Sequence, residues 1–385
     1  MKRTEAGDGN DKKESLFLRK RYIPSFFFCS ISKISQKMMQ LTFVGCGVSC
    51  AVPVIGHLEN HSLLSGENTN NNNNTHMCCC AEAASNLHSK NRRNNVSLLI
   101  TLPKKDDGMD MSNKDSLIAQ YKKRISILID CGKTFRDAYF SVLASIPLHY
   151  VDALLLTHGH ADAMQCVEEV VALHEQTGAT VPEKEREQLL PLITHLPTFL
   201  TPNTLREVLS VSSGLAAQMA VVHDPQQAAA KEALSMTEGE IALQLHVLPD
   251  RTCVRLDPFL RDRLSALDSH GSDFPIYAVP VEHGKNYMSL GFVFGTGVCF
   301  VGEDNNDHKN GSCIVYLSDM SAHTDVSVQF LQSLTKIDVL VIDLLAGKGK
   351  SSPAHYCWDD IFPCIYEMLN ETNAPKKNLL CRHVL

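Results

Sequence analysis

The stretch Leu154-Leu155-Leu156-Thr157-His158-Gly159-His160-Ala161-Asp162 is the most informative part of this sequence. Its leucines predict a short buried strand that runs directly into a His-x-His-x-Asp turn. Two histidines placed two residues apart at a strand end can direct both imidazoles into one site, and neutral imidazole is a good zinc ligand. A nearby carboxylate, here Asp162, can hold a second ion or orient a water molecule. The alternative is a polar loop that happens to contain two histidines, and the helical spacing that follows disfavours it.

Hydrophobic periodicity in the rest of the chain predicts a sheet-rich α/β protein. An asparagine run at Asn70–Asn74 and a polar stretch from Lys104 to about Tyr121 interrupt the pattern and predict loops inside one domain. The predicted strands cover residues 41–44, 96–102, 124–130, 153–156, 276–281, 288–294, 314–317, 339–342 and 378–380. The predicted helices cover residues 135–144, 163–174, 183–190, 204–218, 224–240 and 358–370.

The composition is that of an average globular chain. Of the 385 residues, 44% are hydrophobic and 21% are charged, which excludes a fully disordered, collagen-like or coiled-coil protein. The longest apolar run is far shorter than the roughly 20 residues that a membrane helix needs, so no membrane partner is expected. A net charge of −7 argues against a generally basic surface for nucleic acid, although a local basic groove stays open.

The first 38 residues and the cysteine content indicate the cellular compartment in which the protein is expected. Residues 1–38 are predicted to be a disordered N-terminal extension, because Lys33 and Lys37 break their short apolar patch. The 14 cysteines, in a chain of this length without a clean signal peptide, fit reduced thiols and a cytoplasmic protein. Mitochondrial targeting stays open, and the early acids Glu5 and Asp8 count against it.

Several further motifs, in order, resemble one superfamily. Phe43-Val44-Gly45-Cys46-Gly47-Val48-Ser49 is similar to an opening strand and Gly-rich turn, and Lys90-Asn91-Arg92-Arg93-Asn94-Asn95-Val96-Ser97 to a "KNRRxxxS" segment. The stretch from Ile129 to Arg136 resembles "IDxGxxFR". Together they resemble the metallo-β-lactamase-fold hydrolases, and within them the branch that contains bacterial phosphoribosyl cyclic phosphodiesterase. The resemblance implies an α/β fold, a four-layer αββα sandwich over residues 39–385, with helical and low-complexity insertions near 58–88, 103–121 and 176–275.

The resemblance also implies a set of metal ligands. His158 and His160 would be joined by His283, which ends the strand-like run Val279–Glu282. Asp319, at the end of another apolar run, resembles the aspartate that is shared by two ions, and Asp162 would hold the second ion. Taken alone, His283 could be an exposed loop histidine, and Asp319 could be a helix cap or a turn residue.

Two departures from the family pattern put the second ion in doubt. The superfamily usually has histidine directly after the aspartate of the turn, and this chain has Ala163. Glu168 or Glu169 could supply an oxygen ligand instead, although on a helix an exposed charge is the more common role. The family's last metal histidine follows the final strand, where His383 could substitute.

Other candidate site residues come from the same resemblance. His355, in Ser351–Tyr356, resembles a histidine that contacts phosphate or protonates the leaving oxygen; a surface or capping histidine is the alternative. Arg92 and Arg93 could clamp a phosphate, because guanidinium binds phosphate bidentately, or could pair within the fold. A structural zinc site could use His57, Cys78 and Cys80, although three adjacent cysteines lack the usual spacing.

The resulting hypothesis is a metal-dependent hydrolase of phosphodiester bonds. Zinc is the expected ion, with manganese and iron as alternatives, and a small phosphorylated substrate is the expected partner; the resemblance alone favours a cyclic or phosphoribosyl phosphate. An RNA-processing nuclease and a thioester hydrolase of the same fold stay open, as does a metal-binding scaffold that has lost turnover. The region 180–275 is neither strongly basic nor glycine-rich, which weakens the nuclease. Whether the chain binds nucleic acid or forms a homodimer stays open.

Overall fold

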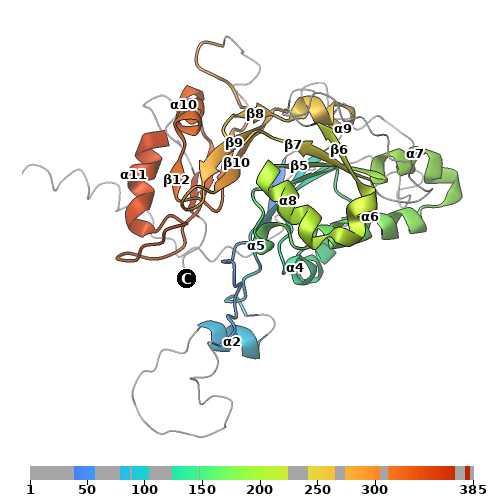
Figure 1. Cartoon of the computed structure of the whole chain (residues 1–385), viewed down its shortest axis with the longest axis horizontal. Helices are drawn as coiled ribbons and strands as arrows, with labels where there is room; N and C mark the ends of the chain where they lie inside the picture. The colour runs from blue at the N-terminus through green and yellow to red at the C-terminus, as the bar shows by residue number, and fades with distance from the viewer. Residues whose placement is uncertain are drawn as a thin grey trace, which may run out of the picture. The chain divides into compact units, whose positions relative to one another are not determined.

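Two β-sheets form the centre of this computed structural model (Figure 1). The structure describes residues 39–56, 79–86, 89–103, 124–146, 148–223, 242–264, 274–303, 311–368 and 378–381. All of these residues belong to one compact unit.

The first sheet has the strand order β1-β2-β3-β4-β5-β7-β6. The pairs β1-β2 and β2-β3 are antiparallel, and the remaining pairs are parallel. Because β3 and β4 run in parallel, the residues that follow them meet at one edge of the sheet. The strands are β1 (Gln40–Gly45), β2 (Ser97–Pro103), β3 (Arg124–Ile129), β4 (Ala153–Leu155), β5 (His195–Leu200), β6 (Met219–His223) and β7 (Ala242–Val247).

The second sheet has the order β12-β9-β10-β11-β13-β14, and β8 pairs with β9 outside this path. The strands from β12 to β11 pair antiparallel, whereas β11, β13 and β14 are parallel. The ends of β11 and β13 therefore also lie at one edge. The strands are β8 (Val254–Arg255), β9 (Ile276–Glu282), β10 (Met288–Phe294), β11 (Ile314–Leu317), β12 (Ala322–His323), β13 (Val339–Ile342) and β14 (Asn378–Cys381).

Three apolar clusters show how the layers pack. The largest lies between the sheets and joins residues of the first, such as Ile127 and Phe199, to residues of the second, such as Phe292 and Tyr316. A second cluster packs α4 (Phe135–Ser141), α5 (Ala161–Met164), α6 (Val167–Thr180) and α8 (Pro202–Val211) on the outer face of the first sheet. A third packs α10 (Asp325–Ser333) and α11 (Trp358–Met368) on the second sheet. The predicted αββα layer order is confirmed.

The region 176–275 differs from the expected insertion. Its described residues contribute β5, β6 and β7, which complete the first sheet, and β8 of the second. Pro197 lies inside β5, where proline normally argues against a central strand, and this hid β5 in the sequence. The helix predicted at 224–240 lies outside the described residues. The remaining elements are α2 (Cys79–Ser85), α7 (Glu183–Ile193), α9 (Arg261–Leu264) and the 3₁₀ turns Leu143–Ser145, Ser213–Gln218 and Asp257–Leu260.

None of the described helices is both long enough and apolar enough to cross a lipid bilayer.

Candidate metal centre

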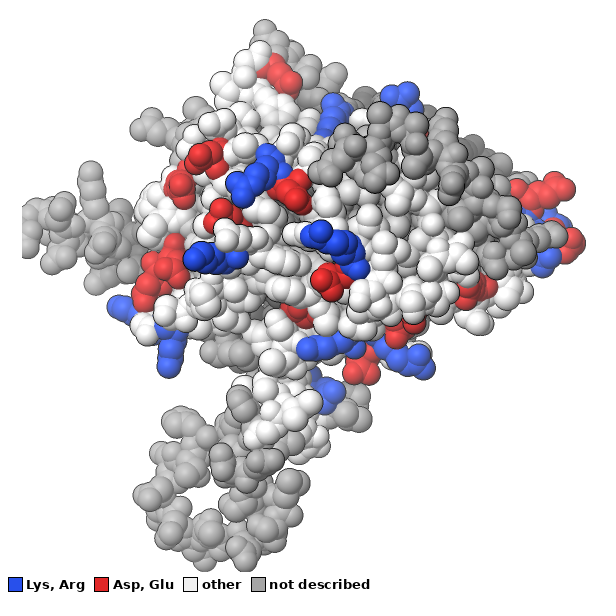
Figure 2. All heavy atoms as spheres, in the orientation of Figure 1, with Lys and Arg blue, Asp and Glu red and all other residues white. Residues whose placement is uncertain are grey.

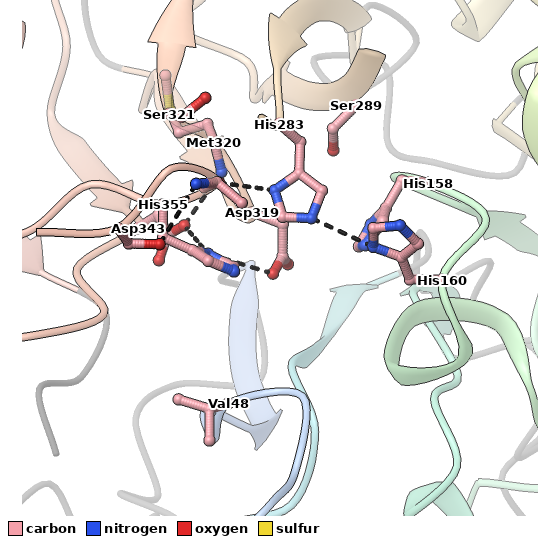
Figure 3. A network of polar contacts seen from close by, with 12 residues as sticks. Val48, His158, His160, His283, Ser289, Asp319, Met320, Ser321, Asp343 and His355 are labelled. Atoms are coloured by element: carbon pink, nitrogen blue, oxygen red, sulfur yellow. Dashed lines mark hydrogen bonds and ion pairs between the residues drawn. The ribbon is translucent and has the colours of Figure 1, made fainter. Parts of the chain in front are cut away.

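The ends of three strands, together with a loop, bring a group of histidines and aspartates together (Figure 3). The His158-Gly159-His160 turn follows β4, His283 follows β9, and Asp319 follows β11. Their ligand atoms form three overlapping groups, and within each group all atoms lie within 4.8 Å of one another. The groups are His158, His160 and His283; His158, Asp162 and Asp319; and His283, Asp319 and His355.

The ring of His283 is oriented for a ligand at its Nε2 atom. Its Nδ1–H donates to the carbonyl oxygen of Ala354 at 2.8 Å, so Nε2 carries a lone pair. The Nε2 atom lies 3.2 Å from Nδ1 of His160. Two nitrogens that share a tetrahedral zinc ion at 2.0–2.1 Å would be about 3.3 Å apart. The spacing therefore fits one ion held by both rings.

His158 is prepared in the same way by its neighbours. The Thr157 hydroxyl donates to Asp130 Oδ2 at 2.8 Å, and the Thr157 N–H donates to Asp130 Oδ1 at 2.8 Å. Because the Thr157 hydroxyl donates its hydrogen to Asp130, its oxygen is available to accept from Nδ1–H of His158, 2.9 Å away. The Nε2 atom of His158 then carries a lone pair, and it is buried without a hydrogen-bond partner among the described residues. An unpaired buried nitrogen at this position is what a metal site requires.

Burial keeps these imidazoles in the form that binds metal. Burial lowers the pKa of His158 to about 4, and it also lowers the pKa of His283. Both rings are therefore neutral near pH 7. Burial raises the pKa of Asp130 well above its usual range, and the two hydrogen bonds from Thr157 oppose that shift.

Two of the site aspartates have unusual backbone conformations. Asp130 has φ = 60° and Asp319 has φ = 50°, in the left-handed region that few residues other than glycine adopt. Both are buried; Asp130 directly follows β3, and Asp319 lies two residues after the end of β11. Such conformations persist where the surrounding structure imposes them, and they cluster at functional sites.

His355 reaches the group from the loop between β13 and α11. Its Nδ1 lies 2.6 Å from Oδ2 of Asp343 and 3.9 Å from Oδ1 of Asp319, and its ring centroid is 4.8 Å from that of His283. The buried Asp343 also accepts from the N–H of Met320 at 3.0 Å. Asp343 was not predicted from the sequence, although it directly follows the apolar strand Val339–Ile342 and so carries the same signal as Asp319.

The other predicted site residues lie apart from these groups. Glu168 and Glu169 are in the first turn of α6, and Glu169 interacts with the thiol of Cys166. Arg92 donates to the carbonyl of Ala83 at 3.0 Å, and Arg93 donates to the carbonyls of Lys90 and Arg92. These contacts favour pairing within the fold over a phosphate clamp.

The predicted structural zinc site is described only at Cys80. This thiol lies in a small apolar cluster with Val52 and Ala83, and it accepts from the N–H of Val54 at 3.4 Å. His57, Cys78 and His383 lie outside the described residues.

The layers and the position of the site together decide the architecture. Helices cover the outer faces of two packed sheets, and the histidines and aspartates gather where strands of both sheets end. The chain has a metallo-β-lactamase fold. No family model matches the sequence, and no curated protein does.

Several solved structures are similar to this chain. One is a diphosphatase of the PhnP family, with 17% identity over 90% of this chain and 97% of that chain and a TM-score of 0.48. Another is the short form of human tRNase Z, with 13% identity, coverage of 90% and 97%, and a TM-score of 0.43. A third is the metallo-β-lactamase fold protein YhfI from Bacillus subtilis, with 10% identity, coverage of 89% and 96%, and a TM-score of 0.43. Activity has to be argued from the site itself, because one fold hosts many reactions.

Proposed function

We propose that this chain is a metal-dependent hydrolase of phosphodiester bonds. The observation that carries the proposal is the pair of oriented imidazoles, His158 and His283, whose Nε2 lone pairs lie beside the carboxylates of Asp162 and Asp319. Nitrogen donors and ionised oxygen donors in one buried group suit a divalent cation. Zinc is the first expectation for such a set, followed by manganese and iron.

The residues present divide into ligands and groups for proton transfer. His158, His160 and His283 would hold one ion, and Asp162 and Asp319 would provide oxygen ligands toward a second. A bound divalent cation would supply Lewis acidity, lowering the pKa of water and neutralising phosphate charge. Asp162 would then align the attacking water from its position at the start of α5.

His355 is the residue suited to protonate the leaving oxygen. Asp343 accepts from its Nδ1–H at 2.6 Å, so proton transfer to a substrate would use Nε2. The same carboxylate provides a countercharge to the imidazolium form and fixes the orientation of the ring. An alkoxide leaving group needs such an acid, whereas a thiol with a pKa near about 8.5 leaves readily as thiolate. This pair therefore favours phosphodiesters over thioesters.

The charge pattern on one face of the molecule, together with the net charge of −7, supports a small substrate over RNA. Lys and Arg side chains lie interspersed with Asp and Glu on the described part of the face in Figure 2. A nucleic-acid backbone usually requires an extended basic track. A cyclic or phosphoribosyl phosphodiester stays the preferred class on the resemblance noted above.

The test is to measure metal content and turnover on the same preparations. The full chain is purified without added metal or an affinity tag, its metal is quantified by elemental analysis, and hydrolysis of bis(p-nitrophenyl) phosphate and of a 2′,3′-cyclic nucleotide is followed. We expect His283→Ala to lose metal and activity together on both substrates. His355→Ala should keep its metal and lose turnover of the cyclic nucleotide, whose alkoxide leaving group needs a proton, while hydrolysis of bis(p-nitrophenyl) phosphate, whose leaving group needs none, should be affected less. His195→Ala, an exposed histidine on β5, is the control and should change neither.

Two results would contradict the proposal. Stoichiometric metal in the wild-type protein with no hydrolysis of either phosphodiester would identify a metal-binding scaffold. Turnover that His283→Ala leaves unchanged would place the chemistry elsewhere.

A further inference from the structure

Tyr287, the residue directly before β10, contacts both sides of the metal centre. Its ring stacks on the ring of His160, with the centroids 4.7 Å apart and an interplanar angle of 18°. Its hydroxyl oxygen accepts from the N–H of Gly159 at 3.0 Å. The Tyr287 side chain therefore contacts both Gly159 and His160 of the turn that follows β4 in the first sheet. Tyr287 itself lies directly before β10, a strand of the second sheet.

The backbone of Tyr287 is tied to the third histidine ligand. The N–H of His283 donates to the carbonyl oxygen of Tyr287 at 2.8 Å and closes a tight turn. Two residues of this turn have positive φ, Gly284 at 76° and Asn286 at 61°. Tyr287 thus packs on His160 and is joined through its backbone to His283. It therefore positions the turn that carries His160 relative to the turn that follows His283.

His160 needs such support more than the other two histidines. His158 is oriented by the Thr157 hydroxyl and His283 by the Ala354 carbonyl, and both rings are buried. His160 is exposed, and among the described residues its ring makes a hydrogen bond only to His283. An exposed side chain without a fixed rotamer must be ordered when an ion binds, and that ordering weakens binding. Stacking on Tyr287 orders the ring in advance.

The close approach of Gly159 depends on the same contact. A Cβ added to Gly159 would meet the Tyr287 hydroxyl at 3.2 Å and the Cγ of Glu207 at 2.8 Å. The turn therefore lies directly against Tyr287, with no space for another side chain between them. Burial raises the pKa of Tyr287, so the hydroxyl stays protonated and neutral at physiological pH.

We propose that Tyr287 is a positioning residue for the metal centre: it packs on His160 and holds Gly159, and by fixing this turn against His283 it sets the affinity of the three histidines for a divalent cation. The proposal rests on the proposed function only in requiring an ion at these histidines. It does not depend on which bond is hydrolysed.

The experiment compares zinc affinity in three variants of the full chain, by competition with a chromophoric chelator. Tyr287→Leu removes both the stacking ring and the hydroxyl, and we expect a loss of about 10- to 100-fold, the usual effect of removing an outer partner of a metal ligand. Tyr287→Phe keeps the ring and should recover most of the affinity. Tyr366→Leu, an exposed tyrosine on α11, is the control and should bind zinc as the wild type does.

A second readout separates positioning from general stability. The visible spectrum of the cobalt(II)-substituted protein reports ligand geometry, and we expect it to shift in Tyr287→Leu and to return toward the wild type in Tyr287→Phe. Wild-type zinc affinity together with an unchanged cobalt spectrum in Tyr287→Leu would overturn the proposal. If the wild type binds zinc but hydrolyses no phosphodiester, the proposed function fails while these affinities still decide the role of Tyr287.

Discussion

The hydroxyl of Thr157 connects the buried carboxylate of Asp130 to the buried imidazole of His158. Removing it tests whether this hydroxyl orients His158 for metal binding. The side chain is fully buried; it donates to Asp130 at 2.8 Å and meets Nδ1 of His158 at 2.9 Å. Thr157→Val replaces the hydroxyl with a methyl group of similar size, so it opens no cavity. The change leaves a carboxylate oxygen of Asp130 and the Nδ1–H of His158 without this partner in a buried environment.

The magnitude follows from those two groups. A buried polar group left unsatisfied costs about 1–3 kcal/mol, so two such groups predict a loss of about 2–6 kcal/mol in the free energy of unfolding. The same substitution releases the His158 ring from the tautomer that presents Nε2. The loss of such an outer partner typically weakens metal binding about 10- to 100-fold. Both effects come from one oxygen atom.

The assay is urea unfolding of the metal-free protein, together with zinc competition on the folded protein. Thr157→Ser keeps the hydroxyl and should retain near-wild-type zinc affinity. Thr198→Val removes another buried threonine hydroxyl, whose described bond is to the local carbonyl of Leu196, and should cost less than about 1.5 kcal/mol. A Thr157→Val protein with wild-type zinc affinity and no greater loss of stability than Thr198→Val would refute the Asp130-Thr157-His158 relay.

Three further predictions follow from the same structure. Gly132→Ala should destabilise the fold by more than about 2 kcal/mol in urea unfolding, because an added Cβ would lie 1.8 Å from the backbone oxygen of Asp162; an unchanged unfolding midpoint would contradict this packing. Asp343→Asn should lower kcat about 100-fold or more while metal content stays constant, and metal lost in proportion to activity would instead make Asp343 part of metal binding. Burial lowers the pKa of His174 to about 4 from 6.5, so the unfolded chain binds a proton at higher pH than the folded one. The stability that the fold gains from keeping His174 neutral is complete above about pH 6.5, so the free energy of unfolding should fall by about 2 kcal/mol between pH 7.5 and pH 5. In His174→Gln the free energy of unfolding should depend less on pH. If the variant and the wild type show the same pH dependence, another group is responsible.

Local pattern indicated several of the residues that the structure brings together, because each candidate ligand stands near the end of an apolar strand. The pattern is visible at Leu156-Thr157-His158, at Glu282-His283 and at Ser318-Asp319. The clustering itself needed the tertiary structure, because β4 belongs to the first sheet and β9 and β11 to the second, so these strand ends meet only when the two sheets pack together. Hydrophobic periodicity predicted only a sheet-rich α/β protein, and the αββα layer order was expected from the resemblance to a known superfamily.

The supporting contacts could not be predicted, because they join residues that are distant in sequence through tertiary packing. Tyr287 stacks on His160 across 127 positions, and His355 is paired with Asp343 by a loop whose course no periodicity indicates. Pro197 obscured the strand β5; it pairs with Gln244 of β7 but precedes the first pair with β4, which is at Thr198, so it lies where β5 is paired on one side only. The sequence around each of these residues carries little information about its position, because that position is set by packing against many distant residues.

The Nε2 atom of His355 can either bind a second ion or donate a proton, and the geometry around the ring bears on which role it takes. Its Nδ1 is committed to Asp343, so a single nitrogen, Nε2, is left for either a second ion or a proton. The same imidazole lies in a group with His283 and Asp319 that could hold metal. A nitrogen that coordinates an ion carries no proton to deliver, so the two uses exclude each other. Recruiting His355 as a ligand would cost the acid that an oxygen leaving group requires. The contact of Nδ1 with Asp343, at 2.6 Å, fits both uses, since it would supply a countercharge to an imidazolium and would also orient Nε2 toward an ion. Asp343→Asn separates them, because we propose proton transfer for His355 and therefore expect activity to fall with the metal retained.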